Sequence, residues 1–185
     1  MEIYMKKSVY EKMRLSALQY YQKAGIVLTE EEKARIEVAD FGLDMVEQVG
    51  LQLLTYINTE RVCAKEMVLL PFQACPEHMH VPTANLPGKE ETFRCRYGRV
   101  YLYVADKQTA CQSVDDHPIP PTDITVYNRV VLDAGQQYTI FPETLHWFMA
   151  GKDGAVISEF STKSTDETDR FTDPRIVRET KIEED

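Results

Sequence analysis

The sequence predicts a mainly β fold in which α-helices come first and a barrel of two β-sheets follows. Hydrophobic residues recur at helical spacing early in the chain, and from Gly50 onward they fall in short alternating segments. The chain has 185 residues, of which 43% are hydrophobic, so it is long enough to bury a full barrel core. Helices followed by a run of strands indicate a double-sheet barrel with the helices packed on it.

Two helices are expected before the barrel. Hydrophobic residues lie near helical spacing within residues 7–24, and Gly25 follows as a C-terminal stop. The residues that carry this spacing are Tyr10, Met13, Leu18 and Tyr21. Thr29 and Glu32 have the spacing of a capping box, in which each side chain bonds the backbone of the other residue. A second helix is therefore expected over residues 30–39.

The rest of the chain predicts strands and a single domain. The expected strands are 51–58, 62–70, 77–81, 91–97, 99–104, 125–132, 137–141, 146–150 and 155–161. Because no linker or repeat divides the chain, residues 1–185 are interpreted as one domain. Its parts are a helical segment at 1–48, the barrel at 49–176, and a solvated, frayed acidic tail at 177–185.

Composition excludes several classes of protein. The formal net charge of −9, without clustered Lys and Arg, argues against nucleic-acid binding, since a phosphate backbone would be repelled. No apolar run approaches the length of a membrane span, and the first residues lack a hydrophobic signal core. The four cysteines, Cys63, Cys75, Cys95 and Cys111, show neither C-x-x-C spacing nor the density of a secreted scaffold. We therefore expect a reduced, cytoplasmic protein.

The histidines are the main functional signal. His78 and His80 alternate on a predicted strand, so both imidazoles point to one face, about 7 Å apart along the backbone. His146 follows a turn at residues 142–144 and starts another strand. His117 lies in a proline-rich stretch that predicts a surface loop, so it is left out of the site. Three inward-pointing imidazoles are candidate metal ligands.

Glu91 is the candidate carboxylate ligand. Residues 91–97 alternate so that Glu91 and Cys95 face the interior while the arginines face out. An acid on an apolar face is costly unless it is paired or binds a cation. At this point two readings stay open: a metal site, or hydrogen-bonded core histidines with Glu91 paired to Arg94 or Lys89.

The chain resembles the cupin superfamily at two motifs. The first, G-x5-H-x-H-x3,4-E-x6-G, is matched by His78, His80, Glu91 and Gly98, and the second, G-x5-P-x-G-x2-H-x3-N, by Gly135 and His146. There are departures from both motifs. Ten residues separate His80 from Glu91, and four motif positions carry other residues: Phe72 for the first glycine, Phe141 for proline, Glu143 for glycine and Ala150 for asparagine.

More specifically, the chain resembles the D-lyxose isomerase family over nearly its whole length. The resemblance rests on the turn-rich insertion at 81–90, on residues 91–104 and on residues 171–176. It implies a cupin barrel that binds a free pentose and interconverts D-lyxose and D-xylulose through an enediol. It also implies a divalent metal held by His78, His80, Glu91 and His146, for which Mn²⁺ is the first expectation and Fe²⁺, Co²⁺ and Zn²⁺ are the alternatives. A homodimer is implied in the same way.

An enediol mechanism needs a proton shuttle that is not a metal ligand. Glu159 shares a strand face with Ala155 and Ile157 and so points inward, where an apolar barrel would suit a carboxylate base. A structural acid is the alternative. Lys89, two residues before Glu91, is the second catalytic candidate, and a solvated loop lysine is its default interpretation.

Two other functions use the same residues. A cupin dioxygenase would bind Fe²⁺ and O₂ with the same three His and one Glu, and a non-catalytic cupin would bind a pentose without converting it. A sugar phosphate is disfavoured as substrate because the chain has no Gly-rich phosphate loop, although Arg94 offers one candidate phosphate contact.

Overall fold

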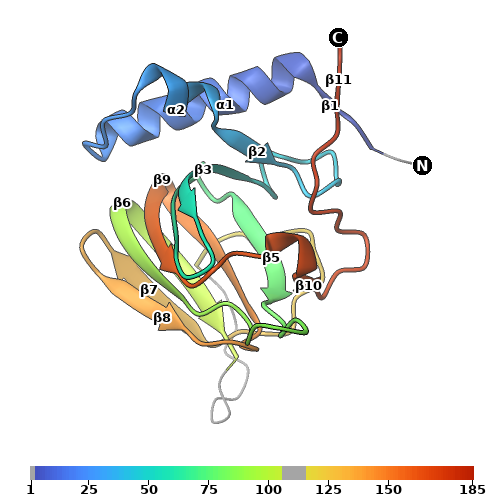
Figure 1. Ribbon diagram of the computed structural model, residues 1–185. Coiled ribbons are helices and arrows are strands. Elements are labelled where there is room, and N and C mark those ends of the chain that lie inside the picture. Colours follow the sequence, from blue (N-terminus) through green and yellow to red (C-terminus); the bar gives the residue numbers. More distant parts are fainter. Residues whose placement is uncertain (1–2, 106–115) are drawn as a thin grey trace.

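The computed structural model describes residues 3–105 and 116–185, and it confirms a mainly β cupin barrel with helices on its outside (Figure 1). Met1, Glu2 and Cys111 lie outside the described residues, so the expectations for them are not addressed. Within the described residues, neither α-helix is long and apolar enough to cross a membrane. Whether the chain is one domain, as the sequence indicates, stays a prediction.

The first helix confirms its prediction and the second is shorter than expected. Helix α1 spans Lys7–Lys23, and α2 spans Glu30–Ala34 with the capping box of Thr29 and Glu32 present. The prediction of helix as far as residue 39 is wrong, because Glu37–Ala39 forms strand β2 and pairs antiparallel with β3. Val38 is fully buried there, so strand pairing and packing outweigh helix propensity.

The sequence predicted most of the barrel strands, but it divided two continuous strands into four and did not predict the short strand at Arg170–Phe171. The strands are β3 (Leu51–Asn58), β4 (Cys63–Leu69), β5 (Ala74–Met79), β6 (Glu91–Val104), β7 (Arg129–Asp133), β8 (Gln137–Ile140), β9 (His146–Ser161) and β10 (Arg170–Phe171). One sheet path runs β10-β5-β9-β4-β3-β2, and β6 pairs with β7, β8 and β9. The predicted pairs 91–97 with 99–104 and 146–150 with 155–161 are each one continuous strand.

Strands β6 and β9 pair along their whole length and bend together. Gly98 has φ +71° and Gly154 has φ +74°, and a Cβ at Gly98 would lie 2.0 Å from the Gly154 carbonyl oxygen. The ladder shifts register on both sides of Gly98, as bulged strands do where they bend. A straight strand would hold His146 and Glu159 roughly 43 Å apart, at about 3.3 Å per residue. Instead, Glu159 and Glu91 line one cavity, and Nε2 of His146 lies 3.1 Å from the same Glu91.

The interior of the barrel is apolar except at one end. Aromatic and aliphatic side chains from both halves fill it, with Phe93 packed edge-on against Phe148 at a centroid distance of 4.9 Å. Cys95 is fully buried in this core, as its strand parity predicts. On the outside, α1 lays Tyr20 and Tyr21 on the sheet, and the Tyr21 hydroxyl donates a hydrogen bond to the backbone oxygen of Glu66.

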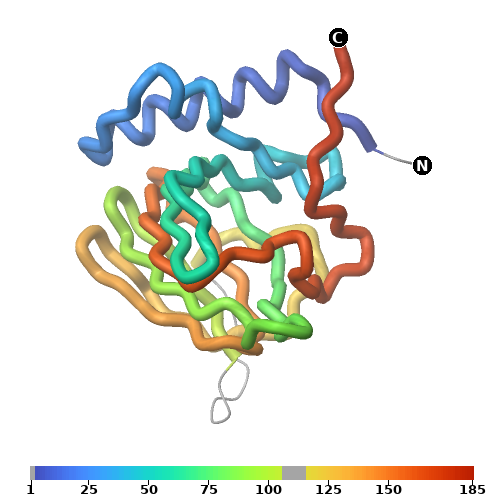
Figure 2. Tube along the Cα trace, viewed as in Figure 1, coloured from blue at the N-terminus to red at the C-terminus, as the bar shows by residue number. Residues whose placement is uncertain are grey.

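The chain end was expected to be a solvated, frayed tail. Most residues from 177 to 185 are exposed, but the tail is paired rather than frayed, so that part of the prediction is wrong. Residues 170–185, here called the C-terminal strap, run from the barrel to the helices (Figures 1 and 2). Strand β11 (Ile182–Glu183) pairs parallel with β1 (Met5–Lys6), and the Thr180 hydroxyl donates to Asp40 at 3.0 Å. Asp185 accepts a hydrogen bond from the backbone nitrogen of Ser8, at the start of α1. These partners lie far away in sequence, so no local pattern predicts them.

Asp173 in the strap makes a pH-dependent contribution to stability. Its side chain is 1% exposed, and hydrogen bonds from Arg175 and from the backbone nitrogen of Asp123 hold its pKa at about 2, below the usual 3.8. A lowered folded-state pKa stabilises the fold above pH 4, and that stabilisation is lost as the pH falls towards 2.

We expect Asp173→Asn to lose roughly 2 kcal/mol of unfolding free energy at pH 7, since one pKa unit corresponds to about 1.4 kcal/mol. Urea unfolding at pH 7 and pH 2.5 tests this, because the gap between the two proteins should narrow in acid. An equal gap at both pH values would contradict it.

Candidate metal centre

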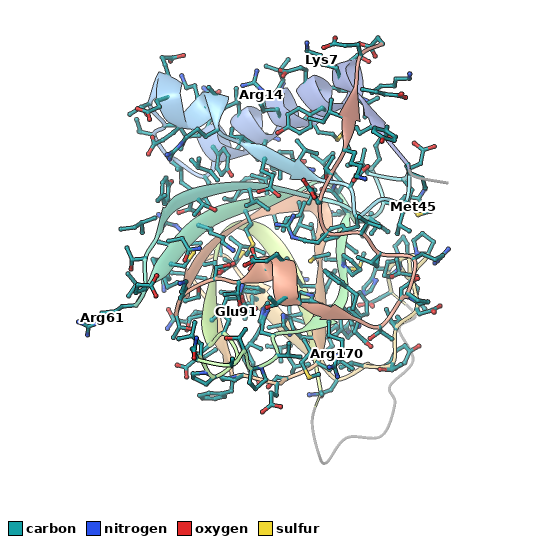
Figure 3. The ribbon with its side chains drawn as sticks, turned by 45° about the vertical axis from the view of Figure 1, so that its right-hand side comes forward. Lys7, Arg14, Met45, Arg61, Glu91 and Arg170 are labelled. Atoms are coloured by element: carbon teal, nitrogen blue, oxygen red, sulfur yellow. The ribbon has the colours of Figure 1, made fainter. Side chains whose placement is uncertain are left out.

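Three imidazoles and one carboxylate meet inside the barrel. His78 and His80 come from β5 and the residue after it, Glu91 opens β6, and His146 opens β9. One ligand atom from each of the four lies within 4.8 Å of the others, and all four side chains are buried. Figure 3 shows Glu91 enclosed by the strands of the barrel. The structure thus brings together all four residues that the sequence proposed as ligands.

The outer nitrogen of each imidazole is held by a separate acceptor. Nδ1 of His78 lies 2.8 Å from the Pro76 oxygen, and Nδ1 of His146 lies 2.8 Å from the Thr144 oxygen. Because a carbonyl oxygen only accepts, these Nδ1 atoms carry the hydrogen and leave Nε2 with a free lone pair. Nδ1 of His80 lies 2.6 Å from Asp169 Oδ1. Such outer partners orient the histidine ligands of metal sites.

The donor set fits a divalent cation. Among the described residues, Nε2 of His146 is a buried atom without a hydrogen-bond partner, although Glu91 Oε1 is only 3.1 Å away. A buried polar atom without a partner costs free energy that a bound cation would relieve. Burial and the two neighbouring imidazoles lower the pKa of His78 well below its ordinary value, so the ring is neutral, as a ligand must be. His78, His80, Glu91 and His146 would hold the cation.

At two positions where the cupin motifs have glycine, this chain has another residue but keeps the backbone conformation that glycine favours. Phe72 and Glu143 stand where the motifs have glycine, and their φ angles are +58° and +60°. Both therefore adopt the left-handed conformation that glycine favours. The Glu143 nitrogen donates to the His80 oxygen at 3.1 Å, which ties the turn before His146 to β5. The turn keeps its shape without glycine.

His117 lies apart from this cluster, in agreement with its exclusion. Its ring stacks on Tyr101 at a centroid distance of 4.7 Å, and its Nε2 lies 2.5 Å from the Tyr103 hydroxyl. It anchors a loop to the outside of the sheet.

Lys89 is buried, so the default interpretation of a solvated loop lysine is wrong. Its Nζ lies 2.8 Å from Glu91, 3.2 Å from Asp166 and 3.3 Å from Glu159. Of the two predicted partners of Glu91, Lys89 is the one in contact, while Arg94 donates to Gln137. Burial lowers the pKa of Lys89, but the three carboxylates outweigh it and raise the pKa well above its ordinary value. Lys89 is therefore a permanent cation beside the metal centre.

Glu159 points into the cavity as expected, but its surroundings are polar. It accepts a hydrogen bond from the Ser161 hydroxyl at 2.9 Å and lies 3.3 Å from Lys89 Nζ and 3.8 Å from Lys65 Nζ. The expectation that an apolar barrel surrounds this carboxylate is wrong. Burial and strand parity place it correctly. The ammonium groups beside it belong to Lys89, the second catalytic candidate from the sequence, and to Lys65.

Four further polar residues line the cavity and were missed by sequence reasoning: Lys65, Asp166, Asp169 and Arg178. Lys65 carried a signal, since it shares the inward parity of Cys63 and Met67 on a strand that is otherwise apolar on that face. The other three lie in segments without periodicity. Asp166 lies 2.5 Å from Lys65 Nζ. Burial raises the pKa of Asp166, but Lys89 and Lys65 outweigh it and hold that carboxyl well below its usual range.

The cavity has two unlike walls. Its empty volume is about 410 Å³, a figure that includes open solvent at the mouth. One wall is apolar, with Phe41, Leu51, Met67, Phe93 and Phe148. The other carries the histidine cluster and the buried charges. A small polyhydroxylated molecule could therefore lie between an apolar surface and a row of hydrogen-bonding groups.

Asp169 offers a test of how the His80 ring is held. Asp169→Asn removes the charge-assisted bond to Nδ1, and we expect divalent-metal affinity to fall about 10- to 100-fold. Competition with a chromogenic chelator measures it. Glu167→Gln, an exposed acid on the same segment, is the control and should bind metal like the unchanged protein. Unchanged affinity in Asp169→Asn would remove Asp169 from the site.

Comparison with known proteins decides the family. The sequence model described as D-lyxose isomerase matches residues 15–185. The chain belongs to the D-lyxose isomerase family. A D-lyxose/D-mannose isomerase of Thermosediminibacter oceani is 53% identical over 184 residues, covering 97% of this chain and 99% of that protein. A D-lyxose ketol-isomerase of Cohnella laeviribosi is 49% identical, covering 98% and 100%.

Solved structures place this D-lyxose isomerase family member in the same fold as another group of enzymes. L-ribose isomerase of Acinetobacter sp. DL28, solved with L-ribose, has a TM-score of 0.73 at 15% identity and covers 98% of this chain and 99% of its own. L-ribose isomerase of Geodermatophilus obscurus has a TM-score of 0.74 at 15% identity, covering 99% and 100%. At this identity the likeness concerns the fold alone.

Proposed function

We propose that this protein is a metal-dependent aldose–ketose isomerase that interconverts D-lyxose and D-xylulose. The observation that carries the proposal is the cluster of His78, His80, Glu91 and His146 beside a buried carboxylate and a buried ammonium group. The names of relatives about half identical over nearly the whole chain support the choice of sugar. The name of one of these relatives includes D-mannose, which makes that hexose a second candidate substrate.

The reaction requires one proton to move between two carbons. In this proposal Glu159 removes the proton from C2, an enediol forms, and Glu159 returns a proton to C1, while the O2 hydroxyl proton passes to O1. Lys89 stays protonated and faces the oxygens on which negative charge develops. A bound divalent cation would supply Lewis-acid polarisation of the carbonyl. The apolar wall limits the access of water to the enediol.

For the metal we propose Mn²⁺, with Fe²⁺, Co²⁺ and Zn²⁺ as the alternatives. A mixed set of three imidazoles and one carboxylate leaves room for more than four ligands, which suits Mn²⁺ and Fe²⁺ better than a closed tetrahedral zinc site. Reconstituting metal-stripped protein with each ion in turn, and measuring turnover per bound ion, tests this order.

One assay tests the function as a whole. Metal-stripped protein receives Mn²⁺ and D-lyxose, and D-xylulose formation and dissolved oxygen are followed together. Xylulose without oxygen loss is expected. Oxygen consumption would instead identify a dioxygenase, and sugar binding without conversion would identify a binding protein.

We also propose a homodimer, which the resemblance to cupins implied. Its support is a pair of exposed apolar side chains, Ile57 of β3 and Phe160 of β9, which flank the half-buried Ala64 of β4 in register. Sedimentation velocity of the unchanged protein and of Phe160→Glu tests it. The cytoplasmic location stays a prediction.

A further inference from the structure

A polar groove adjoins the cavity, and no histidine is among its lining residues. It lies between β2, β3 and the C-terminal strap, and it shares four lining residues with the cavity: Leu53, Lys65, Asp166 and Arg178. Its other walls carry hydroxyl, amide and carboxylate groups, from Tyr10, Thr55, Asn58, Ser164, Glu37 and Thr180. Such a lining suits a polyhydroxylated chain rather than an apolar one.

The polar groups form an ordered row from the metal centre to this groove. Lys89 bridges Glu91 to Asp166, with distances of 2.8 and 3.2 Å. Asp166 Oδ2 then lies 3.8 Å from Nη2 of Arg178. For a sugar with its carbonyl end at the histidines, this row offers hydrogen-bonding groups along a chain that extends towards Arg178.

Arg178 has hydrogen-bonding capacity to spare at that position. Among the residues that the structure describes, its guanidinium makes a single hydrogen bond, from Nη1 to Glu37 at 2.8 Å. The 3.8 Å between Nη2 and Asp166 is too long for a hydrogen bond. A guanidinium has five N–H donors, so several remain for a ligand. Glu37 in β2 holds the group at the boundary between cavity and groove.

We propose that Arg178 is a specificity-determining residue that binds the terminal hydroxyl of a six-carbon aldose. The inference rests on the proposed function and adds a residue that distinguishes a six-carbon sugar from a five-carbon sugar. D-Mannose repeats the configuration of D-lyxose at C2, C3 and C4 and adds one carbon, so its terminal hydroxyl reaches farther along the row. Arg178 therefore favours the hexose, and the pentose ends before it.

The experiment compares Arg178→Met, Arg178→Lys and the control Arg170→Met, an exposed arginine on the same strap, labelled in Figure 3. For Arg178→Met we expect kcat/KM for D-mannose to fall about 10-fold more than for D-lyxose, because a lost hydrogen bond to a charged donor weakens binding by about that factor or more. Arg178→Lys should restore part of the ratio of kcat/KM for D-mannose to kcat/KM for D-lyxose. Arg170→Met should leave it unchanged.

Binding of two sugar alcohols by calorimetry gives a second readout that needs no turnover. D-Mannitol and D-arabinitol are the reduced forms of D-mannose and D-lyxose, and Arg178→Met should weaken only the six-carbon alcohol. A selectivity that stays within twofold in both assays overturns the inference, as does an equal shift in Arg170→Met. If the unchanged protein converts neither sugar, yet the alcohols show the Arg178 effect, the proposed reaction fails and the chain-length inference stands.

Discussion

Alanine in place of His78, His80, Glu91 or His146 is expected to remove the bound divalent metal and nearly all turnover. Three ligands hold an exchangeable ion much less tightly than four, and each imidazole has its Nδ1 fixed so that Nε2 faces the others. Because a metal-assisted reaction loses its Lewis acid with the ion, we expect kcat to fall by about 10³-fold or more in each variant. Elemental analysis of dialysed protein measures the metal directly.

The matched control is His117→Ala. His117 is the remaining histidine of the chain, and its ring stacks on Tyr101 outside the barrel, so metal content and kcat should stay within about twofold. Circular dichroism of every variant separates loss of metal from loss of fold. Full metal occupancy in two or more of the four cluster variants would show that the assignment of ligands is wrong.

The second large effect is expected at Glu159. Glu159→Gln keeps the size of the side chain, so its oxygen still lies within reach of Ser161 and Lys89. An amide, however, cannot accept the proton from C2. We therefore expect kcat to fall by about 10²-fold or more while metal content and sugar binding are kept. Single-turnover kinetics with D-lyxose measures the chemical step. A variant with near-original kcat would remove Glu159 from the mechanism.

Lys89→Met provides the comparison on the same cavity wall. It removes the cation that faces Glu91, Glu159 and Asp166, and it leaves two buried carboxylates and one half-buried carboxylate with less compensation. We expect a smaller fall in kcat than for Glu159→Gln if Lys89 only stabilises charge on O1 or O2. In deuterated water the unchanged enzyme should place deuterium at C1 of D-xylulose made from D-lyxose, as an enediol route requires. Product without deuterium would count against that route.

The sequence predicted the parts of the site that follow strand periodicity. His78 and His80 alternate on one strand, Glu91 and Cys95 share an inward face, and Glu159 follows the same rule, so parity alone aimed these side chains at the interior. The family resemblance then chose between a metal site and a paired acid. Both readings hold in part, because Glu91 faces the three imidazoles and also contacts Lys89.

The parts that were missed depend on contacts between distant segments. Asp169 reaches His80 across 89 residues, and Arg178 meets Glu37 across 141. Asp169 and Arg178 both lie in stretches without helical or strand periodicity, so no local pattern signals that they are buried. The error at residues 35–39 has the same origin, since β3 supplies the hydrogen bonds that convert a predicted helix end into a strand.

The shared bend of β6 and β9 fixes the position of the histidine cluster relative to Glu159. One half of β9 carries His146 and the other carries Glu159, so the angle at Gly98 and Gly154 sets the offset between the histidine cluster and the proposed base. Tyr20 of α1 packs directly over Gly154, closer than any added Cβ would allow. Since a misplacement of about 1 Å can cost about 10²-fold in rate, the outer helix acts as a brace on reaction geometry. A substitution that weakens the packing of Tyr20 on Gly154 would therefore lower the reaction rate, although every residue in the cavity stays unchanged.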